Sequence, residues 1–355
     1  MAVFDQQSYA AHERIIFVSD RAAGLTAIIA MHDRTLGPAV GGTRVYPYAS
    51  ESDALADVLR LSQGMTYKNA LAGLPFGGGK SVIIRDPADK SQALIRAFGR
   101  AVNELQGQYW TGEDVNFSAS DVETLATETP YVLGRTRGTV NTGDPSAFTA
   151  GGVFAGMTAA LAHVFDDDSF VGRRVAIQGV GGVGYQLAKR VKAAGGSLVI
   201  ADIRNDLAAR VSQEFGAKRV EADAVYEQPC DVFAPCAMGA TISHETVPKL
   251  RAPIVCGAAN NQLAAAEIGQ LLLDRNIVYA PDYVVNAGGI INAFGDYSGR
   301  YDVEEVWRRV DAIRETTLQV LDESRRRRRP SHVIADAMAE AILAEKRKTV
   351  AAAAN

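Results

Sequence analysis

The stretch RVAIQGVGGVGY, Arg174–Tyr185, joins an apolar strand directly to a glycine-rich turn. Gly179, Gly181 and Gly184 give it the spacing G-x-G-x-x-G, and a helical pattern continues from there to Ala194. In a dinucleotide-binding unit the first glycine makes the tight turn, the second lets the backbone approach a pyrophosphate, and the third permits close packing of helix on strand. The spacing alone is a weak signal, but strand, turn and helix in this order predict a dinucleotide site.

The residues around this turn indicate which nucleotide would bind. A second apolar strand ends at Asp202, where a carboxylate would accept hydrogen bonds from a ribose. Its charge would repel a 2′-phosphate, so NAD is the expected cofactor, although Arg204 leaves NADP open. Gly182 and Val183, at the start of the helix, would offer backbone N–H groups to the phosphates.

Apolar strands alternate with helices along the second half of the chain, which is typical of a parallel sheet. Strands are expected there at 174–179, 197–202, 231–234, 253–257 and 277–280. In the first half, short strands are expected at 15–30 and 39–46, and helices at 52–63 and 91–106. A segment rich in Gly, Thr and Asn, 134–145, separates the halves and precedes a helix at 147–164.

We therefore expect a two-domain α/β protein with a cleft between the domains. Residues 1–135 would form an α/β domain for substrate binding and oligomerisation, and residues 136–330 a doubly wound Rossmann domain that binds NAD. Residues 331–355 would add a C-terminal helix, whose apolar stripe must pack on one of the two domains. Two domains also suit a chain of 355 residues.

Composition excludes several classes of protein. A net charge of −4 gives no basic field for nucleic acid, and the run Arg325–Arg329 is interpreted as a solvated helix end. No apolar run approaches a bilayer span, and the charged N-terminus lacks the apolar core of a signal peptide, so a cytoplasmic protein is expected. The cysteines and histidines form no metal-ligand pattern, and free thiols are expected at Cys230, Cys236 and Cys256.

A second glycine-rich stretch, LAGLPFGGGKSVII at 71–84, contains a lysine but does not fit a P-loop. Where a Walker A loop needs its first glycine the chain has Leu74, and β-branched residues rather than a helix follow Lys80. Lys80 and Lys68 lie in apolar, glycine-rich surroundings with no acid nearby in the sequence. A desolvated lysine close to another cation can serve as a neutral base, and glycines on a flexible loop let a substrate come close.

Seven stretches of the chain resemble the glutamate/leucine/phenylalanine/valine dehydrogenase family, and most closely its leucine and phenylalanine branches. They span nearly the whole length and read LGPAVGGTR, MTYKNALAGLPFGGGKSVI, YWTGEDVN, QGVGGVGYQLA, CDVFAPCAMGA, CGAANNQLA and YAPDYVVNAGGIIN. The resemblance implies reversible, NAD-dependent oxidative deamination of an L-amino acid to a 2-oxo acid and ammonia. It also implies a homo-oligomer built on the N-terminal domain.

The resemblance further implies a role for each matching residue of the first domain. Lys80 would be the catalytic base, and Asp114 in GEDV would assist proton transfer at the amino group. Lys68 would hold the substrate α-carboxylate with help from the backbone of Gly42. These roles suit the chemistry, because water that attacks an iminium carbon must give up protons to a base.

The same resemblance implies contacts around the nicotinamide. Asn260, with Asn261 beside it, would meet the substrate or the nicotinamide. Thr149 in SAFTAGG and Asn286 in VNAGG would help to seat the nicotinamide end of the cofactor.

The substrate side chain is expected to be apolar. Glutamate-specific relatives carry a lysine and a serine where this chain has Val40 and Ala293, and neither residue can pair a buried carboxylate. With Gly112 and Ile290 these residues form the expected pocket, whose two small members favour room for a ring. L-Phenylalanine is therefore the first expectation, and leucine or valine the alternative, since MTYKNALAGL resembles that branch. A rival from another class is a non-catalytic NAD-responsive binding protein that kept the fold.

Overall fold

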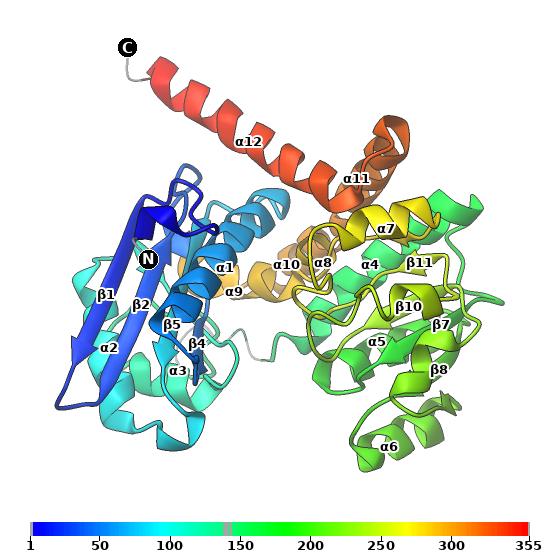
Figure 1. Cartoon of the computed structure of the whole chain (residues 1–355), viewed down its shortest axis with the longest axis horizontal. Coiled ribbons are helices and arrows are strands. Elements are labelled where there is room, and N and C mark those ends of the chain that lie inside the picture. The colour runs from blue at the N-terminus through cyan, green and yellow to red at the C-terminus, as the bar shows by residue number, and fades with distance from the viewer. Residues whose placement is uncertain (1–2, 138–141, 143, 354–355) are drawn as a thin grey trace. The chain divides into compact units, whose positions relative to one another are not determined.

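The computed structural model describes residues 3–137, 142 and 144–353, and it divides into two compact units (Figure 1). Unit 1 comprises Met1–Asp144, Ala293–Asp302 and Ala339–Asn355, and unit 2 comprises Pro145–Asn292 and Val303–Met338. The first junction therefore falls at 144/145 rather than at the expected 135/136. Two later segments also return to unit 1, which a division into consecutive domains did not foresee.

Unit 1 contains a six-stranded sheet in the order β1-β2-β5-β3-β6, with β4 also paired to β5. The expected strand at 15–30 is a hairpin, because the chain turns before Gly24, whose φ is +69°. The expected strand at 39–46 is interrupted at Gly41 and Gly42, which lie between two short strands. The strands are β1 (Arg14–Asp20), β2 (Leu25–Met31), β3 (Ala39–Val40), β4 (Thr43–Tyr46), β5 (Gly77–Ile84) and β6 (Tyr109–Trp110).

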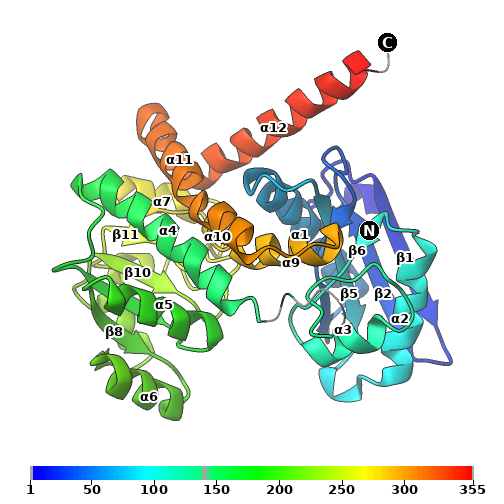
Figure 2. The same ribbon diagram turned by 180° about the vertical axis from the view of Figure 1, so that it is seen from behind.

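Helices cover both faces of this sheet (Figures 1 and 2). Ile28 and Ala30 of β2 pack with α1 (Glu51–Leu71). Ile29 and Met31 share a cluster with residues of α2 (Gln92–Glu104) and α3 (Ala119–Leu125). Successive side chains of a strand point to opposite faces, so the apolar run of β2 is explained by burial on both sides.

Unit 2 is a parallel sheet in the order β12-β11-β10-β7-β8-β9, which is a doubly wound Rossmann arrangement. All five expected strands are present, and β9 was not expected because two exposed basic residues carry no apolar pattern. The strands are β7 (Arg174–Gln178), β8 (Ser197–Ala201), β9 (Lys218–Arg219), β10 (Val232–Pro235), β11 (Ile254–Val255) and β12 (Val278–Tyr279). The two-domain α/β class is therefore confirmed.

Helix α4 (Ser146–Phe165) is long and apolar enough to cross a membrane by length and composition, and in the described part of the chain it alone meets that test. In the structure 67% of its most apolar window is buried. Ala150, Val153 and Met157 belong to the main core of unit 2. Its apolar character is therefore accounted for by packing within that unit.

Of the remaining helices, those before β12 are interspersed with strands, and those after it follow one another without a strand between them. They are α5 (Gly182–Ala193), α6 (Asn205–Phe215), α7 (Ile268–Asp274), α8 (Asp282–Val285), α9 (Gly288–Ser298), α10 (Val303–Asp311), α11 (Ile313–Arg327) and α12 (Ser331–Ala353), with 3-10 turns at Val3–Asp5, Pro87–Asp89, Asp223–Glu227 and Val247–Lys249. The arginine run is exposed at the end of α11, where Arg328 has a left-handed conformation, as expected for a solvated helix end.

The packing of α12, left open by the sequence, differs along its length. Ser331 donates a hydrogen bond to the carbonyl of Tyr279 in unit 2 (2.5 Å). Further along, Glu340 accepts from the hydroxyl of Tyr67 in unit 1 (2.8 Å), and Arg347 forms an ion pair with Asp33. The division between the units falls within this helix, after Met338.

Candidate active site

Lys80 lies within the central strand β5 of unit 1, not on a flexible loop as expected, and is 4% exposed. The glycines before it permit close packing on both faces of the strand. A Cβ on Gly78 would lie 2.0 Å from Oγ1 of Thr66 on α1, and one on Gly79 would lie 2.8 Å from the ring of Tyr109. These two glycines therefore make room for neighbouring protein atoms rather than for a substrate.

An ion pair joins Lys80 to Asp114, which follows β6 in the sequence. The second carboxylate oxygen of Asp114 accepts from Nε of Arg44 (3.0 Å), and Arg44 also pairs with Asp57 (2.8 Å). Burial would raise the pKa of Asp114, but the positive charges of Lys80 and Arg44 outweigh burial and hold that pKa well below its usual range. Asp114 is therefore ionised at neutral pH, and its charge is balanced by two cations.

Three more of the expected residues lie around this ion pair. Gly42 follows β3, and a Cβ there would lie 2.1 Å from the carbonyl oxygen of Glu113. The amide of Thr43 donates to the carbonyl of Gly112 (3.0 Å), so Gly42 and Gly112 lie on adjacent stretches of backbone. Val40 is 1% exposed and pairs with Gly78 across the sheet. The sheet thus brings Lys80, Asp114, Gly42, Gly112 and Val40 together.

Lys68 lies in the last turn of α1, the helix that packs along β5. The expected helix was shorter, ending near Gln63, and would have left Lys68 on a loop. The observed helix continues through Gly64 to Leu71, which fixes the backbone at Lys68.

Tyr109 has a polar role in addition to its packing. Its ring is fully buried, and its hydroxyl lies 2.6 Å from the carbonyl oxygen of Gly41 and 3.0 Å from Oγ of Ser81. Thr43 completes this network through hydrogen bonds to Ser81 and Thr111. The network fixes the turn at Gly41–Gly42. Neither it nor the Arg44–Asp57 pair had any signal in the sequence.

The glycine-rich turn of unit 2 has the geometry expected of a phosphate-binding turn. Gly179 has a φ of +88°, and a Cβ on Gly184 would lie 2.0 Å from the carbonyl oxygen of Gly179. At Gly181, the N-cap of α5, a Cβ would meet only the guanidinium of Arg204, at 3.3 Å. The first and third glycines are thus required by backbone and packing, while the second leaves an open approach to the helix N-terminus. Gly182 and Val183 supply the first amides of that helix.

Asp202 accepts hydrogen bonds from two backbone amides, which the sequence did not predict. Its carboxylate accepts from the amide of Val180 in the glycine-rich turn (2.8 Å) and from the amide of Arg204 (2.8 Å). Arg204 is mostly exposed, and its Nε lies 3.7 Å from the same carboxylate. Asp202 therefore ties the turn to the end of β8, with Arg204 beside it.

Two of the expected nicotinamide residues lie in hydrogen-bonding contact. The side-chain nitrogen of Asn286 donates to Oδ1 of Asn260 (2.8 Å) and to the carbonyl of Ala258 (3.1 Å), while its own Oδ1 is buried without a partner. Such an oxygen is suited to accept from an amide N–H that a ligand brings. Asn261 has a positive φ of 53°, and its carbonyl accepts from Ala240 (2.6 Å).

The start of α9 lies against the first turn of α4. A Cβ on Gly289 would lie 3.0 Å from Oγ1 of Thr149. Ile290 and Ala293 are three residues apart on α9 and so share one face of that helix. Ile290 belongs to unit 2, and Ala293 belongs to unit 1.

Among the residues that the structure describes, no cluster of His, Cys, Asp and Glu could hold a metal ion. All three cysteines are free thiols, and burial raises the pKa of Cys230 and Cys236 to about 12. These thiols are therefore protonated at neutral pH.

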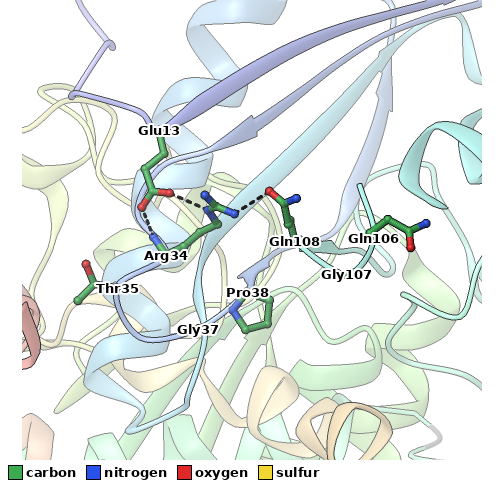
Figure 3. Close-up of a pocket in the computed structure, with 8 residues that line it drawn as sticks. All are labelled: Glu13, Arg34, Thr35, Gly37, Pro38, Gln106, Gly107 and Gln108. Atoms are coloured by element: carbon green, nitrogen blue, oxygen red, sulfur yellow. Dashed lines mark hydrogen bonds and ion pairs between the residues drawn. The ribbon is translucent and has the colours of Figure 1, made fainter. Parts of the chain in front are cut away.

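A separate pocket of about 500 Å³ lies in unit 1 (Figure 3). Arg34 stands between Glu13 and Gln108 there and donates to both, at 2.7 and 2.8 Å. None of the expected site residues lines this pocket, which is formed by Glu13, Arg34, Thr35, Gly37, Pro38, Gln106, Gly107 and Gln108.

Comparison with known proteins gives consistent matches along the chain. Residues 12–137 match the family model described as Glu/Leu/Phe/Val dehydrogenase, dimerisation domain, and residues 200–351 match the model for Glutamate/Leucine/Phenylalanine/Valine dehydrogenase. The chain is 46% identical to leucine dehydrogenase of Thermoactinomyces intermedius, covering 98% of this chain and 95% of that protein. It is 43% identical to valine dehydrogenase of Streptomyces virginiae, covering 95% of each.

A solved structure agrees with these relatives. The crystal structure of L-tryptophan dehydrogenase from Nostoc punctiforme has a TM-score of 0.83 and 40% identity, and the match covers 95% of this chain and 97% of that one. Fold, sequence and site thus point the same way. The chain belongs to the glutamate/leucine/phenylalanine/valine dehydrogenase family and is an oxidoreductase that acts on amino acids.

Proposed function

We propose that the chain catalyses the reversible, NAD-dependent oxidative deamination of a branched-chain L-amino acid, leucine or valine. The observation that carries the proposal is the buried Lys80–Asp114 ion pair beside Gly42. The substrate class is supported by relatives named leucine and valine dehydrogenases. These relatives favour the branched-chain alternative over phenylalanine, which the small residues of the pocket had suggested.

The residues of unit 1 would bind the amino acid and move its protons. Lys68 and the backbone of Gly42 would hold the α-carboxylate and so orient Cα. NAD, when bound, would supply the acceptor for the hydride of Cα. Water would then attack the iminium carbon. Lys80 would pass its ammonium proton to Asp114 across the ion pair and so become the neutral amine that takes a proton from that water, and Asp114 would give the proton it received to the nitrogen that leaves as ammonia.

Glutamate would be rejected by the lack of a cation in the side-chain pocket. Val40, Gly112, Ile290 and Ala293 carry no charge, so a buried side-chain carboxylate would stay unpaired, at a cost of several kcal/mol. Discrimination among apolar side chains rests on volume and is weaker, about 1–3 kcal/mol for each methylene.

The nucleotide would bind to unit 2. The pyrophosphate would lie at the amides of Gly181, Gly182 and Val183, where the helix N-terminus favours negative charge. The negative charge of Asp202 beside that turn favours a free 2′-hydroxyl, and hence NAD, over a 2′-phosphate.

The other end of the cofactor would meet four polar residues of the same unit. The unpartnered oxygen of Asn286 would accept from the carboxamide of the nicotinamide. Thr149, Asn260 and Asn261 would complete the contacts of that ring and of the substrate.

We also propose that the protein is a cytoplasmic homo-oligomer assembled through unit 1. The family model that matches residues 12–137 is described as a dimerisation domain. Strand β1 lies at the edge of its sheet and exposes Phe17, which is 49% accessible. An edge strand with an exposed apolar side chain can pair with a strand of another subunit.

The test of the proposed reaction is a substrate panel. Initial rates of NADH formation are measured at alkaline pH with L-leucine, L-valine, L-phenylalanine, L-tryptophan and L-glutamate. Leucine or valine should have a kcat/KM at least about tenfold above phenylalanine, a difference of ~1.4 kcal/mol, with negligible turnover of glutamate. No NADH from any substrate would favour a non-catalytic NAD-binding protein.

A further inference from the structure

We propose that Trp110 determines specificity by closing the far end of the side-chain pocket, so that it limits the length of the substrate side chain. This inference rests on the proposed function, because it assumes that Val40 and Gly112 line the pocket for an amino acid side chain. None of the roles given above includes Trp110.

The register of the sheet places Trp110 beside the pocket residues. In the parallel pairs β3–β6 and β3–β5, Val40 is aligned with Trp110 on one side and with Gly78 on the other. Aligned residues of neighbouring strands point to the same face of a sheet. Trp110, Val40 and Gly78 therefore form one row across that face.

The next row along the same face contains the proposed chemical site. The amide of Gly41 donates to the carbonyl of Trp110 (3.2 Å), and the amide of Thr43 donates to Gly112 (3.0 Å), so the alignment continues beyond β3. Thr43 is in turn aligned with Ser81. Gly112, Gly42 and Lys80 thus follow Trp110, Val40 and Gly78 by one strand period, on the same face.

Two aromatic contacts hold the indole of Trp110 in place. Its ring lies edge-to-face with Tyr297 of α9 (5.1 Å between centroids) and with Tyr131 (5.5 Å). Tyr297 packs in the same way on Phe76 (4.9 Å), which directly precedes β5. An indole in contact with two aromatic rings cannot swing away to admit a longer ligand without breaking these contacts.

The same helix links this aromatic cluster to the pocket. Ala293 and Tyr297 are four residues apart on α9, so both side chains lie on one face of the helix, one turn apart. The small residues Gly112 and Ala293 would make the pocket wide, and Trp110, fixed by Tyr297, would make it short. A short, wide pocket suits the branched side chains of leucine and valine better than a ring carried on a methylene.

Replacing the indole tests this directly. Trp110→Val places a β-branched residue, which favours strands, in β6 and removes the bulk of the indole. We expect the ratio of kcat/KM for L-phenylalanine to that for L-leucine to rise about tenfold. Most of this change should come from a lower KM for phenylalanine, because the loss of bulk makes room for its ring. The matched control is Trp307→Phe, because Trp307 is the other tryptophan of the chain and packs on Phe148 in unit 2.

The outcomes separate this inference from the proposed function. A rise of about threefold or more in Trp110→Val, with the ratio unchanged in Trp307→Phe, supports the role of Trp110. A smaller change in folded Trp110→Val, or an equal change in the control, overturns it. If the wild-type protein turns over none of these amino acids, the proposed function itself has failed.

A second measurement keeps the native Trp110. In Trp307→Phe the fluorescence of the protein comes from Trp110 alone, and we expect titration with L-leucine in the presence of NADH to shift or quench it with saturation. An emission that does not respond, while the same variant still turns over leucine, overturns the proposal even if Trp110→Val does not fold.

Discussion

Asp114 accepts a hydrogen bond from Lys80, although the local sequence around either residue does not predict this contact. The sheet order β5-β3-β6 brings the residues that follow β6 beside the middle of β5. Arg44, at the start of β4, contacts the same carboxylate at 3.0 Å. The ion pair is therefore a product of strand order.

Removing the lysine should stop the chemistry and spare the cofactor. We expect Lys80→Ala to lower kcat by about 100-fold to 10,000-fold, the range typical of a lost general base. Binding of NADH, measured by fluorescence titration, should stay within about threefold of wild type, since the residues proposed to hold the nucleotide lie in unit 2. The control is Lys90→Ala, which breaks the ion pair of Lys90 with Asp121, also in unit 1. Full activity in Lys80→Ala would remove this residue from the mechanism.

Changing Asp202 should alter the choice of cofactor. We expect Asp202→Asn to raise Kd for NADH about tenfold, or ~1.4 kcal/mol, because the ribose loses a charged acceptor. NADPH should lose less, since the negative charge that opposes its 2′-phosphate is gone. The asparagine still offers an oxygen to the amide of Val180, so the turn keeps its hydrogen bond.

A nearby exposed acid controls for general charge effects at this end of unit 2. Asp206→Asn, in the first turn of α6, should leave both nucleotides unaffected. Equal losses for NADH and NADPH in Asp202→Asn would mean that Asp202 acts only through the turn.

Stability should fall in mild acid because of a buried pair of histidines in unit 1. Burial lowers the pKa of His12 to about 4, and the nearby ring of His32, whose own pKa burial also lowers, adds to the shift. In the unfolded chain His12 takes up its proton near its ordinary value of 6.5, so stability is lost as the pH falls from there towards 4. The slope for one such group is at most about 1.4 kcal/mol per pH unit.

Urea unfolding at about pH 7.5 and about pH 5 measures this loss. His12→Gln should lose about 1 kcal/mol less than the wild type between the two conditions. His244→Gln, at an exposed position, should lose as much as the wild type. The account is wrong if all three proteins respond alike to the change in pH.

Much of unit 2 could be predicted because its signals are local. Each buried strand is a short apolar run, and the glycine spacing at Gly179, Gly181 and Gly184 is fixed by contacts within a single strand–turn–helix unit. The position of Asp202 after β8 predicted a contact with a ribose, and that role stays a prediction. The hydrogen bond from the amide of Val180 to Asp202 was not predicted, because the hydrogen-bond partners of a side chain depend on the folded turn.

Unit 1 was harder to predict, because its signals depend on distant parts of the chain. Three glycines before Lys80 were interpreted as a loop, since glycine is unfavourable in strands. The structure shows that Gly78 and Gly79 are required by Thr66 and Tyr109, which lie far from them in the sequence. The roles of Lys80 and Asp114 were suggested by family resemblance, while the network of Arg44, Asp57 and Tyr109 had no local pattern.

The most direct test of the proposed reaction follows the hydrogen on Cα. The protein is incubated with NAD and L-leucine deuterated at Cα, and the reduced nucleotide is analysed by mass spectrometry. We predict that the reduced cofactor carries one deuterium and that the matching 2-oxo acid and ammonia form in equal amounts, with formation at least about 100-fold slower in Lys80→Ala. Reduced cofactor without deuterium, or no reduced cofactor from any branched-chain amino acid, would contradict the proposed hydride transfer.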